Sequence, residues 1–474
     1  MHPAQNEECS TYGATSSTAH RNRLIIVANR APVRLSQDKW VPAVGGLATA
    51  LLPVLEKQSG LWVSMAENDE APETQHFPEE KPAFDILRIQ LSEQEKADYY
   101  SGMANQAIWP VAHYMIQHLQ LKRSYFETYE AINKKFVDAV LSGYREGDYI
   151  WLQDYHLMLA PQQIRSIHPE AKIAHFWHIP WPAMEVFRIL PWARELIQGL
   201  LGSDLIGFHI EEYVENFLDS VRVLLGAKID GNIIFWQGRE IRVEAHPIGV
   251  DTAYFHKVAN STTVKRDADL LRSQVGTDFL VIGIDRLDYT KGVLSRLLAF
   301  ESFLQQYEEY HGRVTFYQVA TPSRTDVGSY QQLKREVDEA VGRINGAYTR
   351  GIWSPVRYAY RTFSQDELCS IYRAADAALI TPLRDGMNLV TQEFITATDH
   401  GVLVLSELTG AAHILPESVL VNPYDQEGVM NAIKIALELP DAEKKERLST
   451  LKERVNRLDV HTWADGFLKS MQEG

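Results

Sequence analysis

The feature that most constrains the fold is a regular alternation of short apolar runs with helical patterns along most of the chain. Parallel strands need a crossover, usually a helix, so this alternation predicts parallel α/β sheets. The strands predicted in the first half, which ends in a hairpin, are 24–28, 61–63, 148–152, 172–177, 205–208, 233–236 and 240–245. Those predicted in the second half are 279–282, 314–319, 356–360, 377–381, 402–405 and 419–422. No unit of about 20 to 50 residues repeats, which excludes a solenoid.

The length of 474 residues exceeds what one hydrophobic core usually supports, so two domains are expected. The boundary is predicted at His246–Asp251, where Pro and Gly interrupt the pattern, and a polar stretch from Lys257 to Asp269 follows it. The C-terminal region is helical with a break near Asp459. The fold class predicted is α/β, with two Rossmann-like domains that face each other across a cleft. The segments are 1–21 (disordered leader), 22–247, 248–456 and 457–474 (C-terminal helix).

Composition limits the classes of partner that the chain is expected to bind and the cellular compartment in which it is expected to fold. The net charge of −15 argues against nucleic acid and anionic membranes. No apolar run approaches the roughly 20 residues that a bilayer-spanning helix needs, and the polar first residues do not form a secretory signal. Cys9 and Cys369 lie far apart in unlike contexts, so neither a disulfide framework nor a zinc site is expected. A reducing cytoplasm is therefore predicted, and a homo-oligomer is left open.

The segment Thr381–Glu393 has the pattern of a ligand site and follows the apolar run 377–380. Pro382 is expected to stop the strand, Gly386 to free the backbone, and Asn388 to cap a helix. The N–H groups at such a helix start suit a phosphate. Asp385 and Glu393 would repel that phosphate unless they bind hydroxyl groups, one of a sugar and one of a ribose. The segment therefore predicts a sugar-nucleotide site, although an ordinary β–α connection has the same outline.

Basic residues follow several other predicted strands. Arg30 follows the first strand, and Gly45-Gly46 opens the next helix. Arg286 and Lys291 follow the strand that starts at Phe279 and are expected to converge on one diphosphate. Arg324 occupies the same kind of location after a later strand. Together the four cations predict a basic cleft inside an acidic protein.

An alternative for the Arg286–Lys291 loop is a salt-bridged turn, in which Asp285 and Asp288 neutralise the two cations. The chain has no Gly-x-x-x-x-Gly-Lys segment, which excludes a P-loop ATPase. It also lacks a Gly-x-Gly-x-x-Gly segment after a strand, which argues against a dehydrogenase.

Histidines and aromatic residues give weaker signals. Asp154 and His156 follow one strand, and His178 follows the next, with His175 inside it. Their spacing fits no usual zinc pattern, and alternate strand residues point to opposite faces, so no metal site is predicted. Tyr100 and Trp109, in an aromatic helical region, indicate core packing when taken alone.

Seven segments together carry a family resemblance: Asn29-Arg30, Gly45-Gly46, Trp151–His156, His178-Ile179-Pro180, Arg286–Gly292, Ser323-Arg324 and Thr381–Glu393. In this order they closely resemble the trehalose-6-phosphate synthase family, whose members are retaining glycosyltransferases of the two-Rossmann-domain (GT-B) type. The resemblance runs from about Leu24 to the C-terminus. It implies transfer of glucose from a nucleoside diphosphate glucose, often UDP-glucose, to glucose 6-phosphate, without a cofactor or metal. The product, trehalose 6-phosphate, belongs to trehalose biosynthesis and osmoprotection.

The resemblance also implies roles for individual residues. The domain 22–247 would hold the acceptor, the domain 248–456 the nucleotide sugar, and the helix 457–474 would return to the first domain. Acceptor contacts are implied for Arg30, Tyr100, Trp109, Asp154 and Arg324. Arg286 and Lys291 would grip the diphosphate, and Asp385 and His178 the glucose; with Asp154 they form the implied catalytic set. Further donor contacts are implied for Gly45, Gly46, Phe363, Gly386, Met387, Asn388, Leu389, Val390 and Glu393.

Departures from the family pattern keep alternatives open. Met65 stands where members commonly have Trp, and 31–41 is a variable loop near the acceptor, so fine acceptor specificity is open. Glucosylglycerol-phosphate synthases tend to lack the pair Ser323-Arg324, whose presence here favours trehalose 6-phosphate. A phosphorylase-like enzyme would need pyridoxal phosphate, and a silent sugar-phosphate sensor would be expected to lack part of the donor clamp. The chain has no Asp-x-Asp-x-Thr phosphatase motif, so a synthase alone is expected. The preferred base is open.

Overall fold

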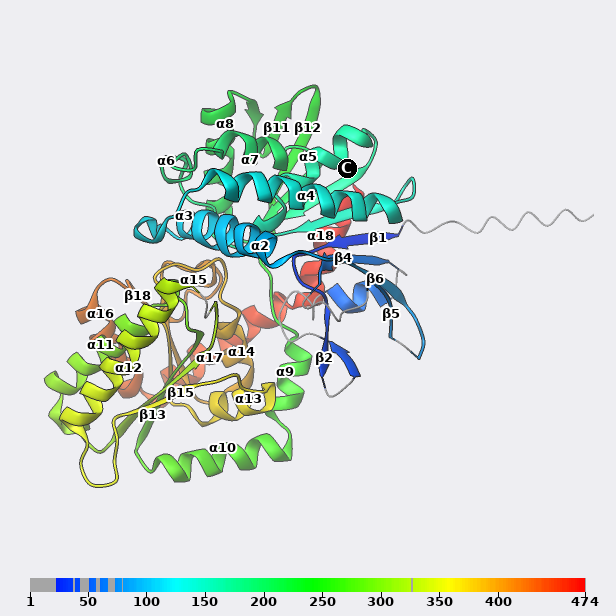
Figure 1. Cartoon of the computed structure of the whole chain (residues 1–474). Coiled ribbons are helices and arrows are strands. Elements are labelled where there is room, and N and C mark those ends of the chain that lie inside the picture. Colours follow the sequence, from blue (N-terminus) through cyan, green and yellow to red (C-terminus); the bar gives the residue numbers. More distant parts are fainter. Residues whose placement is uncertain are drawn as a thin grey trace, which may run out of the picture.

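A computed structural model describes residues 23–36, 39–42, 51–56, 60–66, 73–78, 80–324 and 327–473 (Figure 1). The predicted leader 1–21 and the pair Gly45-Gly46 lie outside the described residues. Two α/β units lie one above the other in Figure 1, joined by a single green segment and by the red C-terminal helices. None of the helices in the described ranges is long and apolar enough to cross a membrane.

The N-terminal unit is built on a ten-stranded sheet in the order β10-β11-β12-β9-β8-β7-β1-β4-β6-β5. Neighbours from β12 through β6 pair in parallel, whereas β5, β10 and β11 pair antiparallel at the two edges. The strands are β1 Leu24–Val27, β4 Leu61–Met65, β5 Thr74–Phe77, β6 Phe84–Ile89, β7 Tyr149–Gln153, β8 Lys172–Phe176, β9 Leu205–Phe208, β10 Lys228–Asp230, β11 Ile233–Trp236 and β12 Arg239–Ala245. A separate hairpin pairs β2 (Val33–Ser36) with β3 (Lys39–Pro42).

The C-terminal unit has a six-stranded sheet in the order β15-β14-β13-β16-β17-β18, and every pair is parallel. The strands are β13 Phe279–Arg286, β14 Val314–Thr321, β15 Val356–Tyr360, β16 Ala377–Ile380, β17 Val402–Ser406 and β18 Val419–Val421. Every residue of β16 and β17 is buried, because helices cover both faces of the sheet.

Helices fill the connections between these strands, as the alternation in the sequence predicts. In the N-terminal unit they are α2 Glu93–Lys96, η1 Ala97–Ile108 (a π-helix), α3 Trp109–Ala112, η2 Ile116–His118, α4 Arg123–Gly143, η3 Tyr155–Leu157, α5 Ala160–Ile167, α6 Met184–Phe187, α7 Ala193–Leu200 and α8 Glu211–Leu225. In the rest of the chain they are α9 Thr252–Ala259, α10 Thr262–Val275, η4 Tyr289–Lys291, α11 Val293–Gln306, η5 Glu308–Tyr310, α12 Gly328–Tyr348, α13 Gln365–Ala374, α14 Leu389–Ala397, α15 Gly410–Ile414, α16 Gln426–Glu438, α17 Asp441–Arg457 and α18 Val460–Gln472.

Two segments contain more regular structure than the sequence indicates. The polar stretch Lys257 to Asp269 lies in α9 and α10. Its few apolar residues, including Val264 and Ala268, recur on one face, and a narrow stripe is enough to dock a helix. The predicted loop 31–41 contains the β2–β3 hairpin, in which Val33 is fully buried.

Each sheet has a switch point, where successive strands are added in opposite directions. Among the parallel strands of the N-terminal sheet this point lies between β1 and β7, and in the C-terminal sheet it lies between β13 and β16. Ligands of such sheets bind beyond the carboxyl ends of the strands at the switch point. Arg30 and Asp154 follow β1 and β7, whereas Arg286 ends β13 and the segment Thr381–Glu393 follows β16. The topology therefore brings the predicted motifs to two switch points.

The two chain segments that run between the units lie against each other. Val460 donates its N–H to Val250 O at 3.2 Å, and Thr252 donates its N–H to Asp459 Oδ2 at 3.0 Å. A Cβ built on Gly249 would lie 1.4 Å from Leu458 O, so only glycine fits. The two crossing segments are thus closely packed and hydrogen-bonded to each other.

After the crossing, α18 packs on the N-terminal sheet (Figure 1). The ring of Phe467 stacks at 4.8 Å on Trp151, and Trp463 meets Phe176 edge-on at 5.0 Å. The C-terminal helix therefore shares a core with β7 and β8 rather than with the unit that precedes it in sequence.

Candidate active site

The turn after β16 places a carboxylate between the two units. Lys291 Nζ forms an ion pair with Asp385, and Asn388 Nδ2 donates to Asp385 Oδ2 at 2.9 Å. Tyr213, from α8 of the other unit, donates its hydroxyl to the Asp385 carbonyl at 3.1 Å. Burial alone would raise the pKa of Asp385, but Lys291 holds this pKa below its ordinary value. Asp385 is thus a fixed, ionised acceptor of hydrogen bonds.

The roles expected for Gly386 and Asn388 are wrong in detail. Asn388 occupies the N-cap position of α14, but its side chain does not cap the helix and its backbone adopts φ 63°. Gly386 is required for space, because a Cβ there would lie 2.3 Å from His178 O of the opposite unit. With no side-chain cap, the first turn of α14, which begins at Leu389 and Val390, keeps N–H groups for an anion. Met387, two residues before α14, is buried.

The salt-bridge alternative for the loop after β13 is also wrong. Asp285 pairs with Arg296 at 2.8 Å, with both side chains almost completely buried, and Asp288 pairs with Arg324 at 3.0 Å. Neither carboxylate forms an ion pair with Arg286 or Lys291. Arg286 is exposed and has no ion-pair partner within the described ranges, so its charge is available to a ligand.

Arg324 reaches from the C-terminal unit into a cage of side chains. Its guanidinium lies 4.2 Å from the centre of the Trp109 ring and donates to Tyr155 Oη at 3.4 Å and to the hydroxyl of Tyr330. Burial alone would raise the pKa of Asp288, but Arg324 and the nearby Arg286 hold it at about 2. The backbone of Arg324 has φ 47°, a conformation that is held only where the surroundings fix it. The surrounding side chains therefore orient the guanidinium.

Arg30 approaches the same place from the N-terminal unit. Its Nη2 donates to Tyr100 Oη at 3.0 Å, and the Tyr100 ring stacks on His156 at 5.8 Å. Burial raises the pKa of the Tyr100 hydroxyl, but Arg30, Arg324 and Arg286 together bring it below its ordinary value. Three arginines from different segments thus act on one phenol.

The turn after β7 carries Asp154 in a constrained conformation. Asp154 has φ 69°, and its Oδ1 accepts the N–H of His178 at 3.2 Å. Burial raises its pKa to about 7, although Arg324 and Arg286 oppose this. His178 interacts through Nε2 with Gln153 Oε1 at 2.9 Å, and burial lowers its pKa well below the ordinary value, so the ring is neutral. Within the described ranges, no three His, Cys, Asp or Glu side chains group closely enough to hold a metal ion.

The remaining predicted donor contacts lie farther along the C-terminal switch point. Glu393, on α14, accepts the hydroxyl of Tyr372 at 2.7 Å, and burial raises its pKa. Phe363 lies after β15, with the Arg361 guanidinium 3.6 Å from its ring centre. Gly45 and Gly46 cannot be placed, since they lie outside the described residues.

Several residues that build this site were not assigned a role from the sequence. Tyr330 and Tyr213 hold Arg324 and Asp385, yet each looks like an ordinary core tyrosine in sequence. Tyr155, which also holds Arg324, lies in the motif Trp151–His156, but the motif alone does not indicate this contact. Asp288 stands inside a recognised motif, but its true partner Arg324 is 36 residues away. Proximity in sequence could not identify that pair.

Comparison with known proteins agrees with this geometry. A family model described as glycosyltransferase family 20 matches residues 21–473. A bifunctional trehalose-6-phosphate synthase/phosphatase of Thermoproteus tenax is 39% identical over 463 residues, or 95% of this chain and 63% of that protein. The chain thus spans less than two thirds of the Thermoproteus protein. A trehalose-6-phosphate synthase of Mycobacterium avium is 37% identical over 479 residues, or 97% of each chain.

Solved structures show the same arrangement of domains. A UDP-forming alpha,alpha-trehalose-phosphate synthase from Burkholderia xenovorans, in complex with glucose 6-phosphate, has 33% identity and a TM-score of 0.87, and the match covers 95% of this chain and 100% of that one. An E. coli structure bound with UDP-2-fluoro glucose has 32% identity and a TM-score of 0.89, covering 96% and 99%.

The two facing Rossmann-like units, with charged side chains gathered at both switch points, define a glycosyltransferase of the GT-B type. More particularly, the chain belongs to glycosyltransferase family 20. The fold class and the family indicated by the sequence motifs are both confirmed.

Proposed function

We propose that this enzyme transfers glucose from UDP-glucose to glucose 6-phosphate with retention, giving trehalose 6-phosphate and UDP. The observation that carries the proposal is the convergence of three arginines: Arg30 donates to Tyr100, and Arg286 and Arg324 both lie over the ring of Trp109. Arg30 and Arg324 suit the 6-phosphate, whereas Arg286 and Lys291 suit the diphosphate. The names of the relatives support the same donor and acceptor.

In this proposal the domains 22–247 and 248–456 bind different substrates. The switch point of the first would hold the acceptor, with Trp109 and Asp154 beside its sugar. The switch point of the second would hold the donor, with the first turn of α14 on the diphosphate and Glu393 on the ribose. Phe363 would contact the base. Charge placement supports this division, because the basic groups lie where each phosphate is expected.

Retention of configuration at the anomeric carbon requires either a carboxylate nucleophile or attack from the same face from which the leaving group departs. Asp385 is engaged by Lys291 and Asn388, and Asp154 accepts a backbone N–H while burial favours its neutral form. Neither carboxylate is free to form a covalent intermediate. We therefore favour front-face substitution, in which the leaving phosphate oxygen takes the proton of the acceptor hydroxyl. Arg286 and Lys291 would stabilise the departing diphosphate, so the reaction would need no added divalent metal.

The test is incubation with UDP-, GDP- and ADP-glucose and with glucose 6-phosphate, glucose or glycerol 3-phosphate. We expect a product of the mass of trehalose 6-phosphate, with both anomeric centres α by NMR, and an unchanged rate in EDTA. Glucose without its phosphate should react poorly. A product from glycerol 3-phosphate alone would replace this proposal with the glucosylglycerol-phosphate alternative, and no product from any pair would favour a sugar-phosphate sensor. Cytoplasmic location and oligomeric state stay predictions.

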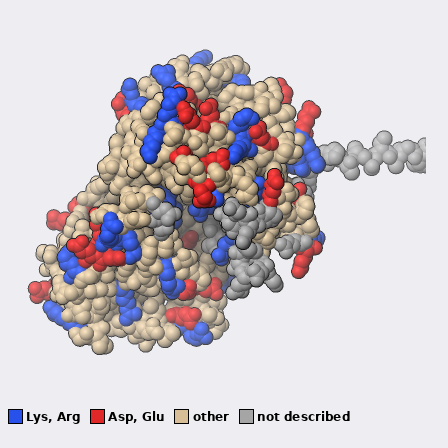
Figure 2. All heavy atoms as spheres, in the orientation of Figure 1, with Lys and Arg blue, Asp and Glu red and all other residues tan. Residues whose placement is uncertain are grey.

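Charge on the surface is consistent with small-molecule substrates. Figure 2 shows Lys and Arg interspersed with Asp and Glu over the visible face. Extended basic surfaces of the kind that bind nucleic acid are not seen on the described part of that face. We propose that the protein does not bind nucleic acid, and a filter-binding assay with labelled DNA and RNA tests this.

A further inference from the structure

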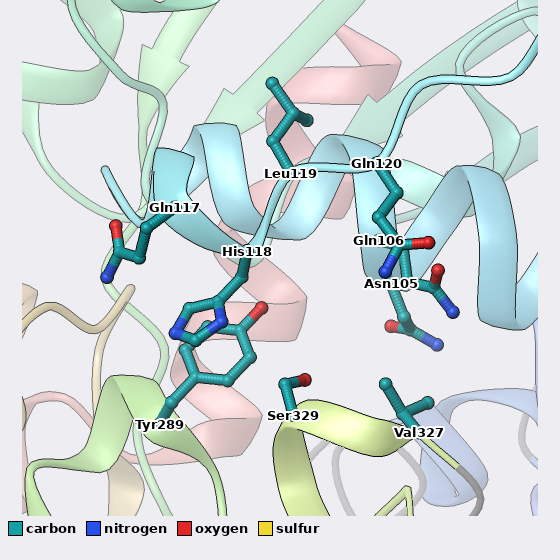
Figure 3. A pocket seen from close by; sticks show the side chains of 9 residues that line it. All are labelled: Asn105, Gln106, Gln117, His118, Leu119, Gln120, Tyr289, Val327 and Ser329. Atoms are coloured by element: carbon teal, nitrogen blue, oxygen red, sulfur yellow. The ribbon is translucent and has the colours of Figure 1, made fainter. Parts of the chain in front are cut away.

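A polar cavity with a volume of about 290 Å³ lies between the two domains (Figure 3). We call it the amide pocket, after the amide side chains that line it: Asn105, Gln106, Gln117 and Gln120. These come from η1 and the segment that follows α3, whereas the opposite wall comes from η4 and the start of α12. None of the residues predicted for either substrate lines the amide pocket.

The lining suits an uncharged, hydroxyl-rich molecule. It contains the hydroxyl of Ser329 besides the amides, and no Lys, Arg, Asp or Glu. Each amide group has both donors and acceptors, as a hydroxyl group has, whereas a phosphate needs a cation or several donors. Burial lowers the pKa of His118, although Asp288 opposes this, so the imidazole in the wall is neutral near neutral pH.

One amide nitrogen in the wall is buried without a partner. Asn105 is 3% exposed, and its Oδ1 accepts the hydroxyl of Tyr155 at 3.1 Å. Its Nδ2 has no hydrogen-bond partner among the described residues. A buried donor without a partner is rare because its lost hydration is not replaced, so its presence beside a cavity indicates a ligand or water that accepts from it.

An aromatic pair joins the domains at the amide pocket. The ring of His118 stacks on Tyr289 with centroids 4.2 Å apart and planes 25° apart, and Figure 3 shows both rings beside the cavity. Flat aromatic surface beside convergent polar groups is a usual composition for a binding site, and it matches the apolar C–H face of a sugar ring. A molecule bound here would touch both domains.

We propose that the amide pocket binds a neutral sugar or polyol, and that its occupancy is coupled to the acceptor site. The coupling route is short, because the Tyr155 hydroxyl donates to Asn105 at 3.1 Å and accepts from Arg324 at 3.4 Å. A ligand that fixes Asn105 also favours the arrangement of Tyr155 and Arg324 that holds the acceptor phosphate. Coupling of this kind is reciprocal, so a filled acceptor site should tighten sugar binding. This goes beyond the proposed transferase activity, in which the amide pocket has no part.

The test is calorimetry of the full chain with trehalose as the probe, and with glucose and glycerol for comparison. The titration is made on the free protein and again with UDP and glucose 6-phosphate at saturation. We expect one saturable trehalose site that persists, and tightens, when the active site is full. Sugar binding that vanishes when the active site is filled would place the sugar in the acceptor site and overturn the proposal, as would no binding at all.

Variants locate the site independently of catalysis. Gln117→Leu and Ser329→Ala, one from each domain, should each weaken trehalose binding at least 10-fold (about 1.4 kcal/mol). The matched control is Gln332→Leu on the exposed face of α12, where the amide bonds Glu336 and Arg335 of the same helix, and it should bind as the wild type does. Equal affinity in both pocket variants, or equal weakening in the control, would refute the assignment. If UDP and glucose 6-phosphate fail to bind, the proposed function fails, while these variants still decide whether the sugar uses this cavity.

Discussion

Replacement of Lys291 by Met removes the cation that pairs with Asp385 and that we propose binds the donor diphosphate. The lysine is 11% and Asp385 13% exposed, and the two form an ion pair beside the N-terminus of α14. Methionine keeps most of the side-chain volume but not the charge. Two effects follow: the leaving diphosphate loses a preorganised cation, and Asp385 loses the partner that keeps its pKa below the ordinary value.

The first effect sets the expected magnitude. Loss of one preorganised electrostatic contact costs about 2–4 kcal/mol of transition-state stabilisation, which corresponds to a decrease in kcat/KM of about 30- to 900-fold. The second effect gives a qualitative signature. Because the pKa of Asp385 rises in the variant, the acid limb of the pH–rate profile should move to higher pH. Arginine at this position keeps the charge, so Lys291→Arg should recover part of the activity and restore the acid limb.

The assay is release of UDP at saturating glucose 6-phosphate, from about pH 4 to pH 9, with urea unfolding to confirm that the variant is folded. The control is Lys134→Met, which removes an exposed lysine that pairs with Asp138 one helical turn away. Such a pair contributes about 0.3–0.5 kcal/mol, so the control should keep nearly full activity. A folded Lys291→Met enzyme with the kcat/KM of the control would refute the assignment of this lysine to the diphosphate.

Three further outcomes are expected. Gly386→Ala should lower the free energy of unfolding in urea by ~1–3 kcal/mol because of overpacking against His178 O, whereas Gly342→Ala, where a Cβ would meet nothing, should be neutral; equal stabilities would disprove the close packing. Arg296→Leu should lower the free energy of unfolding in urea by about 3–5 kcal/mol because it leaves Asp285 buried and unpaired, and the double variant Arg296→Leu with Asp285→Leu should recover part of the loss; an equal loss in both would contradict this explanation. Because the folded pKa of Asp154 is raised to about 7, its neutral form stabilises the fold, and this contribution is lost as pH rises from about 4 to about 7. The unfolding free energy of Asp154→Asn relative to wild type should therefore increase over that interval, and a constant difference would rule out the raised pKa.

Local sequence predicts which segments form strands and which form helices. Apolar runs such as Ala377–Ile380 are long enough only for strands, and the predicted strands, the hairpin around Gln237-Gly238 and the helical break near Asp459 are confirmed. The family could also be recognised in sequence, because its motifs are long and stand in a fixed order. A helix such as α10 is harder to recognise in sequence, because it docks through only a narrow stripe of buried apolar residues.

Only the tertiary structure decided which motifs meet and what each charge pairs with. Strand order places the ends of β1, β7, β13 and β16 at two facing switch points, although these ends are separated by up to hundreds of residues in sequence. It also pairs Asp288 with Arg324 and Asp285 with Arg296, leaving Arg286 for a ligand, whereas proximity in sequence suggested the opposite. The physical reason is the distance along the chain over which each interaction acts. Hydrophobic periodicity and turn chemistry act over a few residues and are written locally, whereas ion pairing and close packing depend on distance in space, which the chain acquires only when its sheets are assembled.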